Sequence, residues 1–201
     1  CEILDCWNSF GALFINNFQD KIAMIEKINR ENQKGKKITI IGLKKSGYAA
    51  ALLGNELGAK IFVSELSKNE EIIHKRNALI DKGIDCELGK HTNRIYDADY
   101  WVISPGVSSY VNVIKKAKKL DIPIIGEIEF ASKLTKLPII AVTGSNGKST
   151  TVSIIHNMLK TENLNPILAG NIGIPLSKII IEAGNSSCFA IFSFVFLYQI
   201  Y

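Results

Sequence analysis

The chain has 201 residues, of which 47% are hydrophobic and 21% are charged, and its formal net charge is +5 at pH 7. Its 15 glycines and 5 prolines are too few for a disordered or collagen-like polymer, and the length predicts one or two globular domains. No run of five or more consecutive like charges is present, so we expect no nucleic-acid partner. The four cysteines form no CxxC pair and have no histidine at ligand spacing, which argues against a disulfide framework or a zinc site and favours a cytoplasmic location.

The two ends of the chain are the least regular parts of the sequence. Residues 1–35 are predicted to be a leader of uncertain structure, in which apolar residues three and four apart favour a helix from about Phe10 to Glu31. Residues 183–201 carry no charge, but the dense apolar part from Cys188 would be about 21 Å long as a helix, which is shorter than the roughly 30 Å of a bilayer core. We therefore expect no membrane span. A chain that begins at Cys1 is expected to be a fragment or a partial reading frame.

Strands and helices alternate through the middle of the chain. Strands are predicted at Lys37–Ile41, Lys60–Val63, Asp99–Ser104 and Ile122–Ile125, and helices at Tyr48–Leu57, Glu70–Lys82, Val111–Leu120 and Glu127–Leu134. A strand, a glycine turn, a helix and a second strand make a βαβ unit, whose strands are parallel. The sequence therefore predicts a doubly wound, Rossmann-like parallel-sheet α/β domain over residues 36–136.

A second α/β unit begins after Pro138. The strand Ile139–Val142 leads into Thr143-Gly-Ser-Asn-Gly-Lys-Ser-Thr150, and a helix is predicted at Thr151–Lys160. A phosphate-binding loop needs glycines that let backbone N–H groups approach the anion, a helix N-terminus, a cation and a hydroxyl for Mg²⁺. We therefore predict that residues 137–201 are the start of a P-loop ATP-binding α/β domain with an atypical tail from about residue 186. The alternative is a glycine turn that only starts a helix.

Each residue of the phosphate loop has an expected role. The residues expected to bind ATP are Gly144, Ser145, Asn146, Gly147, Lys148, Ser149 and Thr150. The Lys148 ammonium would neutralise the β- and γ-phosphates and is the candidate catalytic residue, and the Ser149 hydroxyl would be a ligand of Mg²⁺. The loop departs from the general P-loop pattern, because Val142 stands where the first glycine is expected.

A second glycine turn, from Gly42 to Gly47, follows the first predicted strand, and Glu65 closes the second. This spacing is similar to a dinucleotide fingerprint, but Lys44 replaces the middle glycine and hinders the approach of a pyrophosphate. The alternatives are a bound nucleotide of another kind and an ordinary turn, and a NAD-dependent oxidoreductase is disfavoured. Ser104 ends a strand at the edge where open α/β sheets bind ligands. The histidines His74, His91 and His156 are isolated and are predicted to lack carboxylate or cysteine partners, so we expect them on the surface or on helix faces.

Several strings resemble one family. Leu137-Pro-Ile-Ile-Ala-Val-Thr-Gly-Ser-Asn-Gly-Lys-Ser-Thr-Thr151 and Leu168-Ala-Gly-Asn-Ile-Gly-Ile-Pro175 closely resemble the Mur ligase family, as do Ile40-Ile-Gly-Leu, Ile103-Ser-Pro-Gly-Val107 and Ile125-Gly-Glu-Ile-Glu129. The resemblance covers residues from about 36 to 184. Within the family it favours the branch that adds D-glutamate.

The resemblance implies an ATP-dependent ligase of peptidoglycan precursor synthesis. With ATP and Mg²⁺, such an enzyme would phosphorylate the terminal carboxylate of UDP-N-acetylmuramoyl-L-alanine, and the amine of D-glutamate would displace phosphate to form an amide. Carried over to this chain, Gly42, Ser46 and Glu65 would hold the UDP part, and Ser104 and Asn171 would line the substrate path. The complete enzyme is expected to be monomeric.

The C-terminal part of the chain departs from the family. After a strand expected near Ile180, the family has a Glu/Ser/Ser/Phe segment whose acid binds Mg²⁺, and from residue 186 onward the sequence does not match it. We expect this tail to be an out-of-frame or truncated end and the fragment to be inactive alone. The alternatives are a nucleotide- or UDP-sugar-binding module without ligase activity and another member of the family.

Overall fold

A computed structural model describes residues 28–105, 107, 112–136, 138–142, 146–170, 174–183 and 189–193. The strands are β1 (Lys37–Ile41), β2 (Lys60–Glu65), β3 (Asp85–Leu88), β4 (Tyr100–Ile103), β5 (Ile124–Gly126), β6 (Ile139–Val142), β7 (Pro166–Gly170) and β8 (Phe189–Ser193). The α-helices are α2 (Lys45–Glu56), α3 (Glu70–Ile80), α4 (Asn112–Lys119), α5 (Glu127–Lys133), α6 (Lys148–Thr161) and α7 (Leu176–Ala183), and the 3₁₀ segments are η1 (Arg30–Asn32) and η2 (Asn93–Tyr96).

The first sheet has five parallel strands in the order β3-β2-β1-β4-β5. On one face, side chains such as Ile38 and Ile40 of β1 pack with α2, α3 and α5 in a common core. On the other face, Ile41 and Trp101 pack with α4 and η2. The run Lys37-Ile-Thr-Ile-Ile41 forms a central strand because β-branched residues can be buried on both faces of a pleated sheet. The sequence prediction of a doubly wound parallel α/β domain is confirmed.

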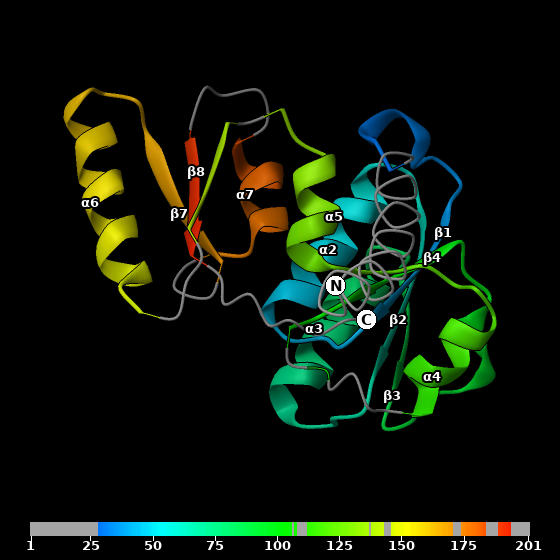
Figure 1. The fold of residues 1–201 in the computed structure, drawn as a ribbon. Coiled ribbons are helices and arrows are strands. Elements are labelled where there is room, and N and C mark those ends of the chain that lie inside the picture. The colour runs from blue at the N-terminus through cyan, green and yellow to red at the C-terminus, as the bar shows by residue number, and fades with distance from the viewer. Residues whose placement is uncertain are drawn as a thin grey trace, which may run out of the picture.

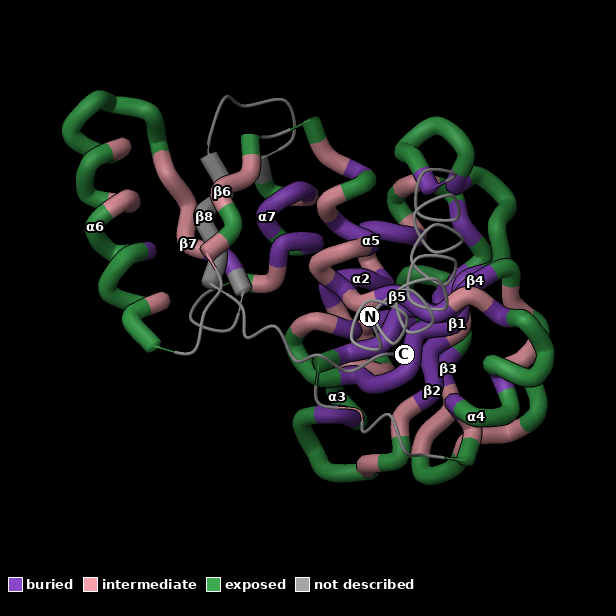
Figure 2. Tube along the Cα trace, in the orientation of Figure 1, coloured by how far each residue is buried: buried purple, intermediate pink, exposed green. Residues whose placement is uncertain are grey.

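The second sheet has three parallel strands in the order β6-β8-β7. Figure 1 shows α6 on one side of this sheet and α7 on the other, between the sheet and the helices α2 and α5. Leu176, Ile179 and Ile180 of α7 lie in the same core as Phe130 and Ala131 of α5. Buried residues line α2, α5 and α7 where these helices meet (Figure 2). The two sheets therefore share one apolar core through α7, and the domain division at residue 136 stays a prediction.

Some predicted elements differ from the observed ones. The strand expected near Ile180 is wrong: Leu176, Ile179 and Ile180 recur at helical spacing after Pro175 and form the buried face of α7. The predicted helix from Phe10 to Glu31 lies mostly outside the described residues. At its end, residues 28 and 29 are not helical, and Asn29 caps the short 3₁₀ segment η1. Within the part of the chain that the structure describes, no helix is long and apolar enough to cross a membrane.

The Thr39 hydroxyl is an unpaired polar group in the middle of the first sheet. Thr39 is 1% exposed, and its Oγ1 has no hydrogen-bond partner among the described residues. Burying an unsatisfied hydroxyl costs free energy, so we predict that Thr39→Val raises the free energy of unfolding by about 1 kcal/mol. Thr39→Ser keeps the hydroxyl and loses the methyl, so it should lower stability. Urea denaturation of the three proteins tests this, and a less stable Thr39→Val variant would contradict it.

Candidate functional site

The chain reverses its winding direction between β1 and β4, at the centre of the first sheet. The strand β1 is followed by α2 on one face of the sheet, whereas β4, its neighbour, is followed by α4 on the other face. Open α/β sheets bind ligands in the crevice that this reversal leaves beyond the carboxyl ends of the two strands. Gly42 follows β1 and Ser104 follows β4, so the structure brings two of the predicted substrate-binding residues to this switch point.

Gly42, Gly47 and Ser104 pack closely at the switch point. The Ser104 hydroxyl, which is 4% exposed, donates a hydrogen bond to the carbonyl oxygen of Gly42 at 3.2 Å. Gly42 has φ +97°, and a Cβ there would lie 3.0 Å from the Cβ of Ser104. A Cβ on Gly47 would lie 1.9 Å from the Gly42 carbonyl oxygen. Both glycines are therefore required by close approach, and together they bring the N-terminus of α2 down onto the strand ends.

The Glu65 carboxylate holds the turn between β1 and α2. Its Oε2 accepts the backbone N–H of Leu43 at 2.7 Å, and its Oε1 accepts that of Ser67 at 2.8 Å. Glu65 is half-buried at the end of β2. The structure places Glu65 beside the turn, where its carboxylate orders two backbone segments, a task that the sequence did not reveal. That Glu65 holds the UDP part stays a prediction.

Three lysines lie near this edge of the sheet, together with the carboxylates Glu65, Glu71 and Glu87. Ser46 is half-buried in the first turn of α2, and Lys44 and Lys45 beside it are exposed. Lys68, also exposed, runs over Gly89, since a Cβ on that glycine would lie 1.8 Å from the Lys68 Cε. Lys44 occupies the place of the middle glycine of a dinucleotide fingerprint, and here it adds an ammonium group near the helix N-terminus. The lysine ammonium groups and the N-terminus of α2 both favour an anionic ligand.

His91 belongs to a network that the sequence analysis missed. Its Nδ1 lies 2.7 Å from the hydroxyl oxygen of Ser64, which donates its one hydrogen to Oε1 of Glu87 at 2.6 Å. The imidazole must therefore donate from Nδ1 to Ser64. Thr92 donates to Glu87 from its backbone N–H and from its hydroxyl. The prediction that His91 has no carboxylate nearby is wrong, because Glu87 comes from β3, an edge strand that the sequence patterns did not identify.

The network shifts the pKa values of His91 and Glu87. Burial lowers the pKa of His91, although the nearby carboxylates Glu87 and Glu65 oppose the shift. For Glu87, burial raises the pKa, but the hydrogen bonds from Ser64 and Thr92 outweigh it and the net pKa is lowered. The network thus favours a neutral imidazole next to an ionised carboxylate and fixes the loop that follows β3.

The phosphate loop leads into the 14-residue helix α6. Its N-cap is Gly147, which has φ +76°, and a Cβ added there would meet no atom of the described residues within 4 Å apart from its chain neighbours. Lys148 is the first residue of the helix, and Ser149 and Thr150 lie exposed in the same turn. The helix begins three residues earlier than predicted, so the hydroxyls lie at its N-terminus, where the macrodipole and free N–H groups favour anions. Asn146 precedes this turn and is exposed.

Three predicted site residues lie outside the described residues. They are Gly144, Ser145 and Asn171. In the described part of the chain, no group of three or more His, Cys, Asp and Glu side chains could hold a metal ion. The Ser149 hydroxyl, exposed at a helix N-terminus beside a lysine, fits a metal held chiefly by nucleotide phosphates, because Mg²⁺ is usually bound by few protein ligands.

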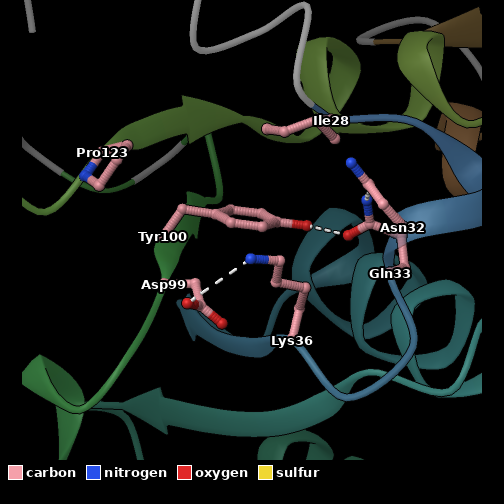
Figure 3. Close-up of a pocket in the computed structure, with 7 residues that line it drawn as sticks. All are labelled: Ile28, Asn32, Gln33, Lys36, Asp99, Tyr100 and Pro123. Atoms are coloured by element: carbon pink, nitrogen blue, oxygen red, sulfur yellow. Dashed lines mark hydrogen bonds and ion pairs between the residues drawn. The ribbon is translucent and has the colours of Figure 1, made fainter.

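A pocket also lies at the opposite, amino-terminal edge of the first sheet (Figure 3). There the Tyr100 hydroxyl donates a hydrogen bond to Gln33 Oε1 at 2.5 Å. The Lys36 Nζ lies 3.8 Å from the Asp99 Oδ1. Gln33 in turn donates to the carbonyl oxygen of Asn29. These contacts tie the segment after η1 to the start of β4, so we assign them a structural role.

A five-stranded parallel sheet with a switch point between β1 and β4, followed by a second parallel sheet, places the chain in the Rossmann-like class of α/β proteins. Residues 37–113 match the family described as the MurD N-terminal domain. The UDP-N-acetylmuramoylalanine–D-glutamate ligase of Chloroherpeton thalassium is 41% identical over 157 residues, which cover 76% of this chain and 34% of that protein. The ligase of the same name from Streptococcus pyogenes is 40% identical over 154 residues, with the same coverage of 76% and 34%.

Solved structures align with the chain less closely. The UDP-N-acetylmuramate:L-alanyl-gamma-D-glutamyl-meso-diaminopimelate ligase from Neisseria meningitides is 21% identical with a TM-score of 0.49, over 81% of this chain and 55% of that chain. On the sequence matches, residues 37–113 are similar to the MurD N-terminal domain, and about three quarters of the chain is similar to curated ligases that bear the name UDP-N-acetylmuramoylalanine–D-glutamate ligase. The chain spans about a third of the length of the curated relatives that it matches.

The close approach at Gly47 can be tested within one helix. We predict that Gly47→Ala lowers the free energy of unfolding by about 1–3 kcal/mol, because its Cβ would collide with the fixed carbonyl oxygen of Gly42. Gly54→Ala in the same helix is the control: its nearest neighbour would be the Ile61 Cδ1 at 2.6 Å, the movable end of a side chain, with the Phe130 ring in ordinary contact at 3.7 Å. Alanine also gains about 1 kcal/mol of helix propensity over glycine. Thermal or urea unfolding measures both variants. If Gly47→Ala and Gly54→Ala lose the same free energy of unfolding, the close approach at Gly47 is contradicted.

The His91 network predicts a pH dependence of stability. Since the folded state lowers the pKa of His91 below its usual value of 6.5, the unfolded chain takes up that proton first as the pH falls. Stability contributed by the neutral imidazole is therefore present above about pH 6.5 and is lost as the pH drops below it. His91→Gln should remove this part of the pH dependence, and His74→Gln on the exposed side of α3 is the control. Identical profiles for His91→Gln and the parent would contradict the assignment.

Proposed function

We propose that this protein acts in peptidoglycan precursor synthesis as the ATP-dependent ligase that joins D-glutamate to UDP-N-acetylmuramoyl-L-alanine. The observation that carries the proposal is the combination, in one chain, of the switch point at Gly42 and Ser104 with a helix, α6, that begins at Lys148 of the predicted phosphate loop. The relatives from Chloroherpeton thalassium and Streptococcus pyogenes bear the name of this ligase. Its nucleotide substrates are charged and water-soluble, so we place the reaction in the cytoplasm.

In this proposal the crevice of the first sheet binds the UDP part of the substrate. The first turn of α2, with Ser46, supplies N–H and hydroxyl donors, and Lys44, Lys45 and Lys68 supply positive charge for a diphosphate. Glu65 fixes the turn from behind through the Leu43 N–H. The absence of side chains at Gly42 and Gly47 lets the first turn of α2 pack directly on the strand ends.

The phosphate loop would hold ATP with Mg²⁺, which supplies charge neutralisation at the transferred phosphoryl group. Lys148 would orient the β- and γ-phosphates by its ammonium group, and the hydroxyl of Ser149 would reach the metal. The backbone N–H groups around Gly147 would surround the phosphate oxygens. Phosphoryl transfer depends mostly on positioning and charge stabilisation, so these residues need not form a covalent bond.

The proposed reaction has two steps, a phosphoryl transfer and an amide-bond formation. The terminal carboxylate of the UDP-linked substrate takes the γ-phosphoryl group of ATP, and ADP leaves. The amine of D-glutamate then attacks the activated carbonyl carbon, the carbon–nitrogen bond forms, and inorganic phosphate leaves with the loss of the amine proton. Ser104 and Asn171 are proposed to line the path of the substrate from the crevice to the phosphate loop.

The phosphate loop is tested by a pair of lysine variants on α6. We predict that Lys148→Ala weakens binding of ATP with Mg²⁺ by roughly tenfold to a hundredfold, because one hydrogen-bonded charge is worth about 1.5–3 kcal/mol. Lys160→Ala, at the other end of the same helix and exposed, is the control and should leave the affinity unchanged. Isothermal titration calorimetry with ATP measures both. Equal affinities for Lys148→Ala and the parent would overturn the role of this loop.

A further inference from the structure

Helix α4 carries a compact group of lysines on its exposed side. Ile114 and Ala117 lie in the core between this helix and the first sheet, and the helix contains no acidic residue. Four of its eight residues are exposed lysines, which we call the lysine face: Lys115, Lys116, Lys118 and Lys119. Figure 1 shows α4 far from the second sheet. Since α4 and α2 cover opposite faces of the first sheet, the lysine face is also turned away from the interface with α7.

Little negative charge offsets the lysine face. The acids around η2, which packs beside α4, are paired with other cations: Asp85 with Arg94, and Asp97 with Lys37. Among the described residues, no ion pair includes a lysine of this face. Asp121, which follows the helix after Leu120, is the acid next to the lysine face in the sequence. The exposed side of α4 therefore carries a net positive charge.

Helix stability does not account for this arrangement. The helix dipole favours cations in the last turn, but Lys115 lies a full turn before Lys119. Like charges three and four residues apart on a helix repel each other and destabilise it. Lysines that repel one another within so short a helix are therefore better explained by an anionic partner, because a surface of one charge sign attracts ligands of the other.

The surroundings of the lysine face favour a lipid surface over a nucleic acid. Leu120 ends the helix and is 52% exposed, and an apolar side chain beside lysines can enter the headgroup layer of a membrane. Nucleic-acid surfaces instead offer aromatic rings on which bases stack. Here the ring of Tyr96 is covered by the Lys116 ammonium, whose Nζ lies 4.4 Å from the ring centre and donates to Asn93 Oδ1 at 3.0 Å.

We propose that the lysine face of α4, with Leu120 at its end, attaches the protein reversibly to a membrane surface that contains anionic phospholipids. Clusters of four or more basic residues on an amphipathic helix are typical of this kind of binding. Each lysine near such a surface strengthens binding by about fivefold, so the attachment is weak singly and depends on the whole group. The inference goes beyond the proposed function and does not depend on it.

Cosedimentation of the whole chain with lipid vesicles tests the proposal. The chain should sediment with vesicles made of equal parts phosphatidylglycerol and phosphatidylcholine, and it should stay in solution with phosphatidylcholine alone. Salt at about 0.5 M should release it, because exposed charges are screened over a few ångströms at that ionic strength. Absence of sedimentation with the anionic vesicles, or equal sedimentation with both kinds, would overturn the proposal.

A triple variant tests the lysine face itself. Lys115→Gln/Lys118→Gln/Lys119→Gln retains Lys116 with its contacts to Tyr96 and Asn93, and it should lower the partition onto anionic vesicles by roughly a hundredfold. Urea denaturation establishes that the variant folds. If it does not, Lys118→Gln alone carries the comparison, with an expected loss of about fivefold.

The matched control removes the same charge from elsewhere on the chain. Lys34, Lys82 and Lys160 are exposed and lie on three separate segments. Lys34→Gln/Lys82→Gln/Lys160→Gln should lower the partition by less than about fivefold, because these lysines do not meet the membrane together. Equal losses in the two triple variants would show that only net charge matters and would overturn the assignment to α4.

Fluorescence at the end of the helix tests how α4 faces the lipid. Leu120→Trp should show a blue-shifted difference emission, relative to the parent, when anionic vesicles are added, since the indole would enter the headgroup layer. An unshifted emission in a chain that sediments would overturn this orientation. Binding to single-stranded RNA that is tighter than binding to the vesicles would overturn the choice of a membrane as the partner.

Discussion

The parallel pairing of β1 with both β2 and β4 is the constraint on which the proposed nucleotide site depends. All three strands end at the same edge, and the connections from β1 and β4 leave it toward opposite faces. Connections that diverge in this way leave a crevice between them. Any side chain at Gly47 would collide with the Gly42 carbonyl oxygen. The N-terminus of α2 therefore packs closely against the end of β1. The location of the proposed site therefore follows from strand order, and the close packing of α2 on the strand ends follows from two glycines.

Helix α7 connects this site to the second sheet. Its apolar face shares the core of α2 and α5, and Ser177 at its start is held by Glu127 of the first unit. In the proposed function, the phosphate loop after β6 and the switch point after β1 act on one substrate. This requires that the two sheets keep a fixed position relative to each other. The apolar core supplies most of the attraction between the two bodies, and the polar pair supplies direction. The two kinds of contact have separate tasks in one interface.

The sequence predicts the central elements well and the peripheral ones poorly. The strand Lys37–Ile41 has the predicted bounds, because a β-branched run between lysine and glycine leaves few other conformations. The strand Asp85–Leu88 was missed, since it is short, lies at the edge of the sheet and mixes charged with apolar residues. Near Ile180 the family resemblance implied a strand, whereas the segment Leu176–Ala183 is a helix whose buried face lies in the core shared with α5.

The candidate site shows the same division. Glycine turns and a lysine before a helix are local signals, and they located Gly42, Ser104 and Lys148 at strand and helix ends. The partners of Glu65, His91 and Glu127 depend on which strands become neighbours, and no local pattern records that. Glu127 meets Ser177 across 50 positions of sequence. Contacts of this kind could be found only after the strand order was known.

The most direct test of the account is to map a UDP titration by NMR on the isotopically labelled chain. We predict chemical-shift changes at the backbone amides of Gly42, Leu43, Gly47 and Ser104, saturating with a single site, and no comparable response to NAD. Changes confined to the opposite edge of the sheet, around Gln33 and Tyr100, or a tighter response to NAD than to UDP, would contradict it.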